Sequence, residues 1–116
     1  MTNETRQRPL DTLVSCHAID QYTADLDFAG YESDRMVRDA VERRLGIIGE
    51  AFSRAAVLEP ALVDQIPELR QIVGLRNRVI HGNDAVDDEI VWDIVENKLP
   101  GLRVRVAELL GKDAPQ

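Results

Sequence analysis

Apolar residues recur at steps of three and four along most of this 116-residue chain, with polar residues between them. This spacing is typical of amphipathic helices, and no alternation of apolar and polar residues runs long enough to predict a strand. The first helix is predicted from Pro9, a residue favoured in a first turn, to Leu26. Residues 1–7 are polar and predicted to fray. Gly30 predicts a turn over residues 28–31.

The second predicted helix has the clearest pattern. Ser33 is its expected N-cap, and Asp34 adds a favourable charge in the first turn. Gly46 and Gly49 lie three residues apart inside it. Interior glycine weakens a helix, so we expect another helix to approach closely here. One face of the helix is apolar and comprises Val37, Val41, Ile48, Phe52 and Ala55, widened by Ala40, Ile47 and Ala51.

Three further helices are predicted in the second half of the chain. One spans residues 68–80, and another begins near Asp87 with acidic residues in its first turn. Pro100 breaks or kinks that helix, and a last helix over residues 102–110 ends at Gly111. The predicted fold is all-α, a small up-and-down helical bundle forming a single domain.

Composition is that of a globular domain, with 44% apolar and 30% charged residues. Aromatic residues make up only 4%, so the core must be aliphatic. The formal net charge of −7 argues against a free-standing nucleic-acid binder, although Arg70, Arg76 and Arg78 form a local basic cluster. The single cysteine, Cys16, excludes an intramolecular disulfide and is predicted to be a core residue.

Two histidines and one cysteine make a His/Cys zinc site improbable. No run of apolar residues predicts a signal peptide or a membrane span, so the cytoplasm is the expected location. Residues 112–116 are expected to fray at the C-terminal end of the single domain, residues 1–116.

The nine residues from Gly74 to Gly82 contain the strongest candidates for catalytic residues. Arg76 and His81 lie five positions apart at the end of a helical pattern. A guanidinium stabilises charge on a phosphate, and an imidazole moves protons near neutral pH. Together they suffice for phosphodiester cleavage without metal.

Helical geometry leaves alternatives open for both residues. Arg76 falls on the apolar stripe of its predicted helix, where it could simply pair with a buried acid such as Glu50. His81 could only cap the last carbonyls. Five residues along a regular helix separate two side chains by about 140°. Either the helix unwinds at His81, or a second copy of the chain completes the site.

An acidic cluster follows the motif. It could bind a divalent metal, but a solvated turn with charges at a helix start is the favoured interpretation. Trp92 is expected in the core or an interface. Arg103 and Arg105 are expected in solvent or against an acidic partner. The members of the acidic cluster are Asp84, Asp87, Asp88 and Glu89.

Residues 75–82 resemble the motif of the HEPN superfamily, in which an arginine precedes a histidine by four to six residues. More specifically, the chain resembles HepT, the toxin of the type VII HepT–MntA toxin–antitoxin modules. Residues 39–51 and 87–95 carry the rest of the match, with Leu99, Pro100 and Leu102 behind them. Order and spacing agree over most of the chain.

The resemblance implies an all-helical homodimer in which two motifs meet across a cleft and form a metal-independent endoribonuclease site. It needs no cofactor and would cleave cellular RNA, either tRNA or mRNA, leaving 2′,3′-cyclic phosphate ends. Arg76 would neutralise the scissile phosphate, and His81 would act as general base or acid. Asn77, Arg78 and Glu50 would orient the site or contact RNA.

The resemblance also implies an MntA-like nucleotidyltransferase antitoxin, which transfers AMP from ATP to a tyrosine two residues after the motif histidine. This chain has Asn83 there, and Tyr22 and Tyr31 lie in other segments. It could be a variant that resists modification, a member neutralised by binding alone, or a degenerate member. A non-catalytic interaction module that binds the nucleotidyltransferase is the alternative function. Arg76 on an apolar stripe argues against a purely structural bundle.

Overall fold

The computed structural model describes residues 3–58, 61, 66, 72 and 87–112, and every secondary-structure element in these ranges is helical. The predicted all-α class is confirmed. The predicted helix over residues 68–80 lies outside the described residues apart from Ile72. In chain order the elements are α1 (Asn3–Thr23), α2 (Phe28–Ser33), α3 (Arg35–Leu58), α6 (Asp88–Asp93), the π-helix η1 (Ile94–Lys98) and α7 (Leu99–Lys112).

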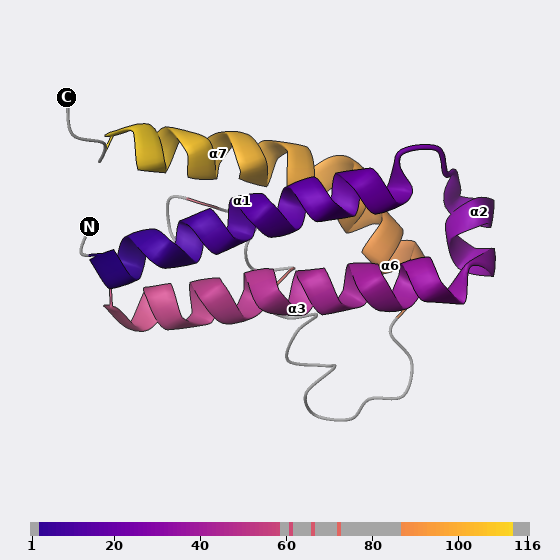
Figure 1. The fold of residues 1–116 in the computed structure, drawn as a ribbon, viewed down its shortest axis with the longest axis horizontal. Helices are drawn as coiled ribbons and strands as arrows, with labels where there is room; N and C mark the ends of the chain where they lie inside the picture. The colour runs from indigo at the N-terminus through magenta and orange to yellow at the C-terminus, as the bar shows by residue number, and fades with distance from the viewer. Residues whose placement is uncertain (1–2, 59–60, 62–65, 67–71, 73–86, 113–116) are drawn as a thin grey trace.

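Three long helices form the body of the bundle (Figure 1). α1 packs against both α3 and α7 and runs antiparallel to them. The short helix α2 closes one end of the bundle, where the chain passes from α1 to α3. The start of α1 and the end of α7 therefore lie together at the opposite end.

The core is almost wholly aliphatic, as the low aromatic content predicted. Val41, Ile48 and Phe52 on the predicted apolar face of α3 are buried, and Val37 packs against them partly buried. Leu45 is 1% exposed and was not predicted on that face. The side chain of Ala55 lies outside the described residues. From the C-terminal half of the chain the core receives Val91, Ile94, Val95, Leu99, Leu102 and Val106.

The bounds of α1 differ from the prediction at both ends. The helix begins at Asn3, six residues before Pro9, so residues 3–7 are helical rather than frayed. A proline in a first turn is a preference that a longer helix can override. The helix ends at Thr23, whose carbonyl accepts a hydrogen bond from the N–H of Leu26 at 3.0 Å. The predicted end at Leu26 was therefore three residues too late.

The turn predicted around Gly30 is the helix α2. Asp27 caps this helix, since its Oδ1 accepts a hydrogen bond from the Gly30 N–H at 2.8 Å. A Cβ on Gly30 would lie 3.1 Å from Cδ2 of Leu26, so glycine allows a close approach here. The prediction treated Gly30 as a residue that ends helices, whereas in the structure its lack of a side chain allows α2 to pack closely against Leu26. Tyr31, the next residue, is completely buried.

α3 is capped by Asp34 and not by Ser33. The Oδ1 of Asp34 accepts a hydrogen bond from the N–H of Val37 at 3.1 Å, as an N-cap does. The hydroxyl of Ser33 instead donates to the carbonyl of Gly30 at 3.2 Å, because Ser33 belongs to α2. The two residue types are equally good caps, and only the short helix before them decides between them.

Among the described residues, no other helix closely approaches Gly46. A Cβ at this position would meet no atom within 4 Å. The close helix approach predicted for Gly46 is therefore not found within the described part of the chain, and nothing there offsets the local weakness of an interior glycine.

The predicted break at Pro100 takes the form of a π-helix and a change of direction (Figure 1). Proline has no N–H, and its ring clashes with the carbonyl four residues earlier, that of Glu96. A single π-turn before Pro100 changes the backbone hydrogen bonding from four residues back to five. The N–H of Leu99 therefore donates to the carbonyl of Ile94. α7 then continues past Gly111 to Lys112, which corrects the predicted end.

A polar junction joins α2, α3 and α6. The Arg38 Nη1 lies 3.6 Å from Oδ2 of Asp88, so an ion pair ties α3 to the first turn of α6. The ring of Tyr31 packs against that of Trp92, with centroids 5.2 Å apart, which confirms the predicted packing role of Trp92. The Tyr31 hydroxyl and the Arg38 Nε are buried without a hydrogen-bond partner among the described residues.

Glu42 faces this junction with an unfavourable charge. Burial raises the pKa of its carboxyl, the charges of Asp39 and Asp88 raise it further, and Arg38 offsets part of the effect. Burial is also the main cause that raises the pKa of the Tyr31 hydroxyl. The ionised form of Glu42 therefore opposes folding.

Truncation of Leu45 should show how strongly α3 depends on its core face. We expect Leu45→Ala to lower the free energy of unfolding by about 2–5 kcal/mol, because a fully buried side chain leaves a cavity. Val104→Ala is the control, since Val104 is 56% exposed. Urea denaturation followed by circular dichroism measures both. A loss for Leu45→Ala no larger than that of the control would contradict the assigned core.

Neutralising Glu42 should stabilise the chain at neutral pH. A carboxyl with a raised pKa opposes folding above its folded-state pKa, and the penalty vanishes as pH falls below its unfolded-state pKa. Glu42→Gln should therefore raise the urea midpoint at pH 7, and this gain should disappear near pH 4. Glu108→Gln, at an exposed position of α7, is the control. A gain for Glu42→Gln that is equal at both pH values would refute the assignment.

Candidate functional site

The motif segment itself lies outside the described residues, so the roles predicted for its side chains stay predictions. What the structure describes is the scaffold on either side of the segment and the helix faces around it. The candidate residues outside the described ranges are Arg76, Asn77, Arg78, His81 and Asn83, together with Asp84 of the acidic cluster.

Both flanks of the segment are tied to the bundle. Ile72, four residues before Arg76 in the sequence, is completely buried, and Ile66 is 2% exposed. Both isoleucines belong to the same core as Leu45. After the segment, Asp87 caps α6 by accepting a hydrogen bond from the Glu89 N–H at 2.8 Å. The described residues on both sides of the motif thus belong to the bundle, Ile72 before it and α6 after it.

The acidic residues after the motif act at the start of α6, as the favoured interpretation predicted. Asp87 is the N-cap, and Asp88 and Glu89 occupy the first turn, where negative charge is favourable. Asp88 also pairs with Arg38. Among the described residues, no three His, Cys, Asp or Glu side chains are grouped closely enough to hold a metal ion.

Glu50 is the one candidate site residue that the structure describes. It lies on α3, half-buried, and its Oε1 accepts a hydrogen bond from Nε of Arg54 at 2.9 Å. The proposed pairing of Glu50 with Arg76 involves a residue outside the described ranges. Glu50 therefore already has one cationic partner, one turn along its own helix.

Glu50 also lines a hollow of about 440 Å³ between α1 and α3. Asp11 contributes from α1, and Gly46 and Ile47 lie on the α3 side. The sequence pattern did not reveal this hollow, because it depends on the missing side chain at Gly46 and on the placement of α1. The one available signal was the glycine inside an otherwise regular helix.

The structure also describes Cys16, Arg103 and the two tyrosines. Cys16 is 1% exposed, which confirms it as a core residue, and burial raises the pKa of its thiol to about 12. Arg103 of α7 meets an acidic partner within the chain, Asp20 of α1. Of the two tyrosines, Tyr31 is completely buried, whereas Tyr22 is 36% exposed.

None of the described helices is both long and apolar enough to cross a membrane. The helices that flank the motif are instead amphipathic, with one face in the common core.

The chain has relatives among curated proteins. A provisionally named RNase of Methanocaldococcus jannaschii is 32% identical over 98 residues, which cover 83% of this chain and 87% of the relative. A second protein of that organism, also provisionally named an RNase, is 30% identical, with coverage of 86% and 82%. A provisionally named ribonuclease HepT of Thermococcus cleftensis is 28% identical, with coverage of 85% and 89%. No solved structure matches the chain significantly.

The sequence profile of one family, described as "Ribonuclease HepT-like", matches residues 12–109. This match covers α2, α3, the motif segment and α6, together with most of α1 and α7. The resemblance inferred from the motif and its two flanking segments is thereby confirmed. The chain belongs to the family of HepT-like ribonucleases.

Proposed function

We propose that this chain is a metal-independent endoribonuclease that works as a homodimer and serves as the toxin of a type VII toxin–antitoxin module. The observation that carries the proposal is the pair Arg76 and His81 inside a stretch that matches the HepT-like ribonuclease family. Cellular RNA, tRNA or mRNA, is the substrate.

The chemistry follows from the two side chains. His81 accepts the proton of a ribose 2′-hydroxyl, and the resulting oxygen attacks the adjacent phosphorus. The 5′-oxygen of the next nucleotide leaves with a proton, and a 2′,3′-cyclic phosphate remains. Arg76 neutralises charge that builds up on the phosphate oxygens. Asn77 and Arg78 position the RNA backbone.

A homodimer brings together catalytic groups that one regular helix holds apart. Two residues five positions apart on a regular helix point about 140° away from each other. When two motifs meet in one cleft, the His81 of one copy serves as the base while the His81 of the partner subunit serves as the acid. The site is then complete only in the dimer.

The partner that restrains this activity is an MntA-like nucleotidyltransferase. Asn83 has no phenol to accept AMP, and the hydroxyl of Tyr31 is buried. We therefore assign restraint to binding of the antitoxin over the motif rather than to AMP transfer at position 83.

Cleavage without metal tests the nuclease directly. The purified chain should cut a mixture of tRNA and mRNA in the presence of EDTA and leave cyclic phosphate ends. Arg76→Ala and His81→Ala should each slow cleavage by roughly 10²–10⁴-fold. His17→Ala is the matched control, since His17 is the other histidine of the chain and is exposed on α1.

Two outcomes would refute the nuclease proposal. One is cleavage that persists in folded His81→Ala. The other is no cleavage by a parent chain shown to be folded and dimeric, which would favour a non-catalytic module that binds the nucleotidyltransferase.

Restoring a phenol at position 83 tests how the toxin is restrained. With an MntA-like nucleotidyltransferase and ATP, Asn83→Tyr should gain the mass of AMP and lose RNA cleavage. Asn83→Phe, which has the ring without the hydroxyl, should gain none. The parent chain should be inhibited by the partner without ATP. AMP found on Tyr22 of the parent, which is partly exposed, would refute restraint by binding alone.

A further inference from the structure

The polar junction of α2, α3 and α6 holds the start of α6 through two contacts. The Nη1 of Arg38 lies 3.6 Å from the Oδ2 of Asp88. The rings of Tyr31 and Trp92 pack against each other with centroids 5.2 Å apart. Asp88 and Trp92 are four residues apart, so they share one face of α6. The ion pair and the ring contact therefore lie one turn apart and together fix how α6 packs against its neighbours.

The two flanks of the motif segment are held by different forces. On the N-terminal side, Ile66 and Ile72 are buried in the aliphatic core. On the C-terminal side, Asp87 caps its own helix, so Asp88 is the first described side chain after the motif whose ion pair reaches another helix. Asp88 lies seven residues after His81 in the sequence. The C-terminal flank of the motif therefore depends on a contact between charges.

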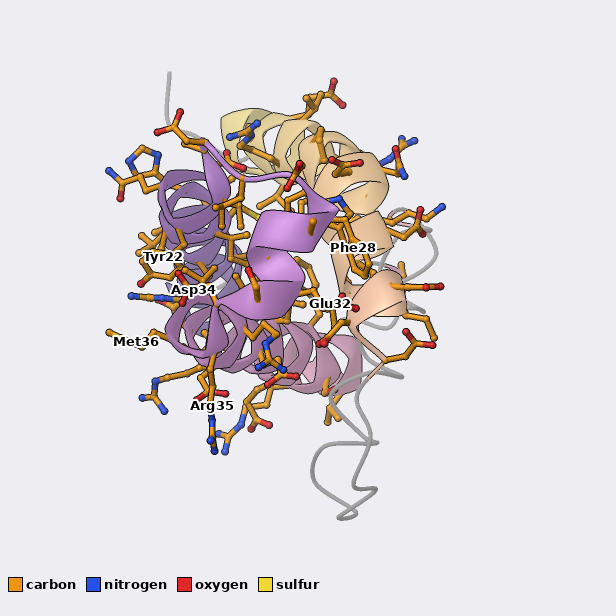
Figure 2. The ribbon with its side chains drawn as sticks, turned by 90° about the vertical axis from the view of Figure 1, so that its right-hand side faces the viewer. Tyr22, Phe28, Glu32, Asp34, Arg35 and Met36 are labelled. Carbon is orange, nitrogen blue, oxygen red and sulfur yellow. The ribbon has the colours of Figure 1, made fainter. Side chains whose placement is uncertain are left out.

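The surroundings of the Arg38–Asp88 pair strengthen it. The side chain of Arg38 is 32% exposed and that of Asp88 is 22% exposed, so water screens their charges less than at an open surface. The pair of Arg35 and Asp39 differs, since its atoms lie 4.0 Å apart and its side chains are 86% and 68% exposed. Figure 2 looks onto the end of the bundle that α2 closes and shows Arg35 pointing away from the bundle. The Arg35–Asp39 pair lies within α3 and holds no second helix.

Arg38 also supplies positive charge among the carboxylates of the junction. Burial raises the pKa of the Glu42 carboxyl most, and the charges of Asp39 and Asp88 raise it further. Arg38 acts in the opposite direction. The carboxylates of Glu42 on α3 and Asp88 on α6 therefore repel each other. Without Arg38, this repulsion would push the first turn of α6 away from α3.

From this arrangement we propose that Arg38 is a positioning residue for RNA cleavage. By holding Asp88 against α3, it fixes the start of α6 and thereby the point at which the chain that follows His81 joins the bundle. Arg38 acts through Asp88 and does not touch RNA. Because a misplacement of about 1 Å in a reacting group can slow catalysis about 10²-fold, a small displacement of α6 is enough to lower the rate. The inference rests on the proposed function, in which His81 transfers protons.

Arg38→Gln in the full chain tests the positioning role. With a tRNA that the parent chain cleaves in EDTA, kcat should fall roughly tenfold or more, while KM changes less than about threefold, because the residues that contact RNA are unaltered. Arg35→Gln is the matched control, since it removes the same residue type from the exposed pair and should leave kcat unchanged. Rates are compared where circular dichroism shows each variant fully folded, so a loss of stability alone does not lower kcat. An unchanged kcat in folded Arg38→Gln would overturn the inference.

A second substitution tests whether repulsion causes the loss. Arg38→Gln/Glu42→Gln removes a carboxylate that repels Asp88 and should be faster than Arg38→Gln by about threefold or more. A general disturbance of packing would instead leave the double variant as slow or slower, which would contradict the proposed cause. Asp88→Asn removes the other partner of the pair and should lower kcat even where Arg38→Gln does not fold. Glu89→Gln, at an exposed position in the same turn of α6, is its control.

Trp92 provides a readout that does not depend on RNA cleavage. It is the single tryptophan of the chain, is partly buried, and packs against Tyr31 one turn after Asp88. In Arg38→Gln, its fluorescence emission should move to longer wavelength and acrylamide should quench it more, because displacing the first turn of α6 admits water to the ring. Arg35→Gln should match the parent chain. Unchanged emission and quenching in Arg38→Gln would show that Arg38 does not hold α6 and would overturn the inference.

The two proposals fail in different ways. Equal cleavage by the parent chain and by folded Arg38→Gln would overturn the positioning role and leave the nuclease standing. A folded parent chain that cleaves no RNA would refute the nuclease and, with it, the role of Arg38 in cleavage. The fluorescence of Trp92 would in that case still show whether Arg38 holds α6, which separates the structural step of the inference from the catalytic one.

Discussion

Burial of one face of α3 is the interaction on which the rest of the structure depends. With few aromatic residues in the chain, Leu45, Ile48 and Phe52 supply much of the apolar surface at the centre of the bundle. α1 packs along this helix, and α2 and α6 meet its first turns through Tyr31 and Arg38. Ile66 and Ile72 join the same core, so the chain before the motif is anchored to the packing that α3 organises.

The helices could be predicted because one physical signal, the three- to four-residue apolar period, determines them. The errors lie where two local preferences compete. Ser33 and Asp34 are equally good caps, and only the presence of α2 decides between them. Gly30 predicts a turn by composition, yet it sits in a helix that buries Tyr31. At Pro100, by contrast, the predicted break or kink is present, as a π-turn and a change of direction.

For the candidate site, too, some features could be predicted from the sequence and others could not. Arg76 and His81 could be named from sequence because each residue type has a definite chemistry and their spacing is short. The Arg38–Asp88 ion pair could not, since it joins two helices separated by fifty residues of chain. The start of α6 near Asp87, with acidic residues in its first turn, could be predicted because helix-end charges act on their own helix. The chemistry of residues close together in the chain can therefore be predicted from the sequence. Contacts between segments far apart in the chain can be identified only from the structure.

The two faces of α3 are not independent. A helix that buries Leu45 on one side has its opposite side determined, because turning the helix would expose that leucine to water. The core therefore sets where Gly46 and Glu50 lie, and with them the lining of the hollow between α1 and α3. The same core holds Ile66 and Ile72, so the chain that leads to the motif is anchored by the packing that orients α3. One apolar face of one helix thus determines both the position of Glu50 and the point from which the motif segment starts.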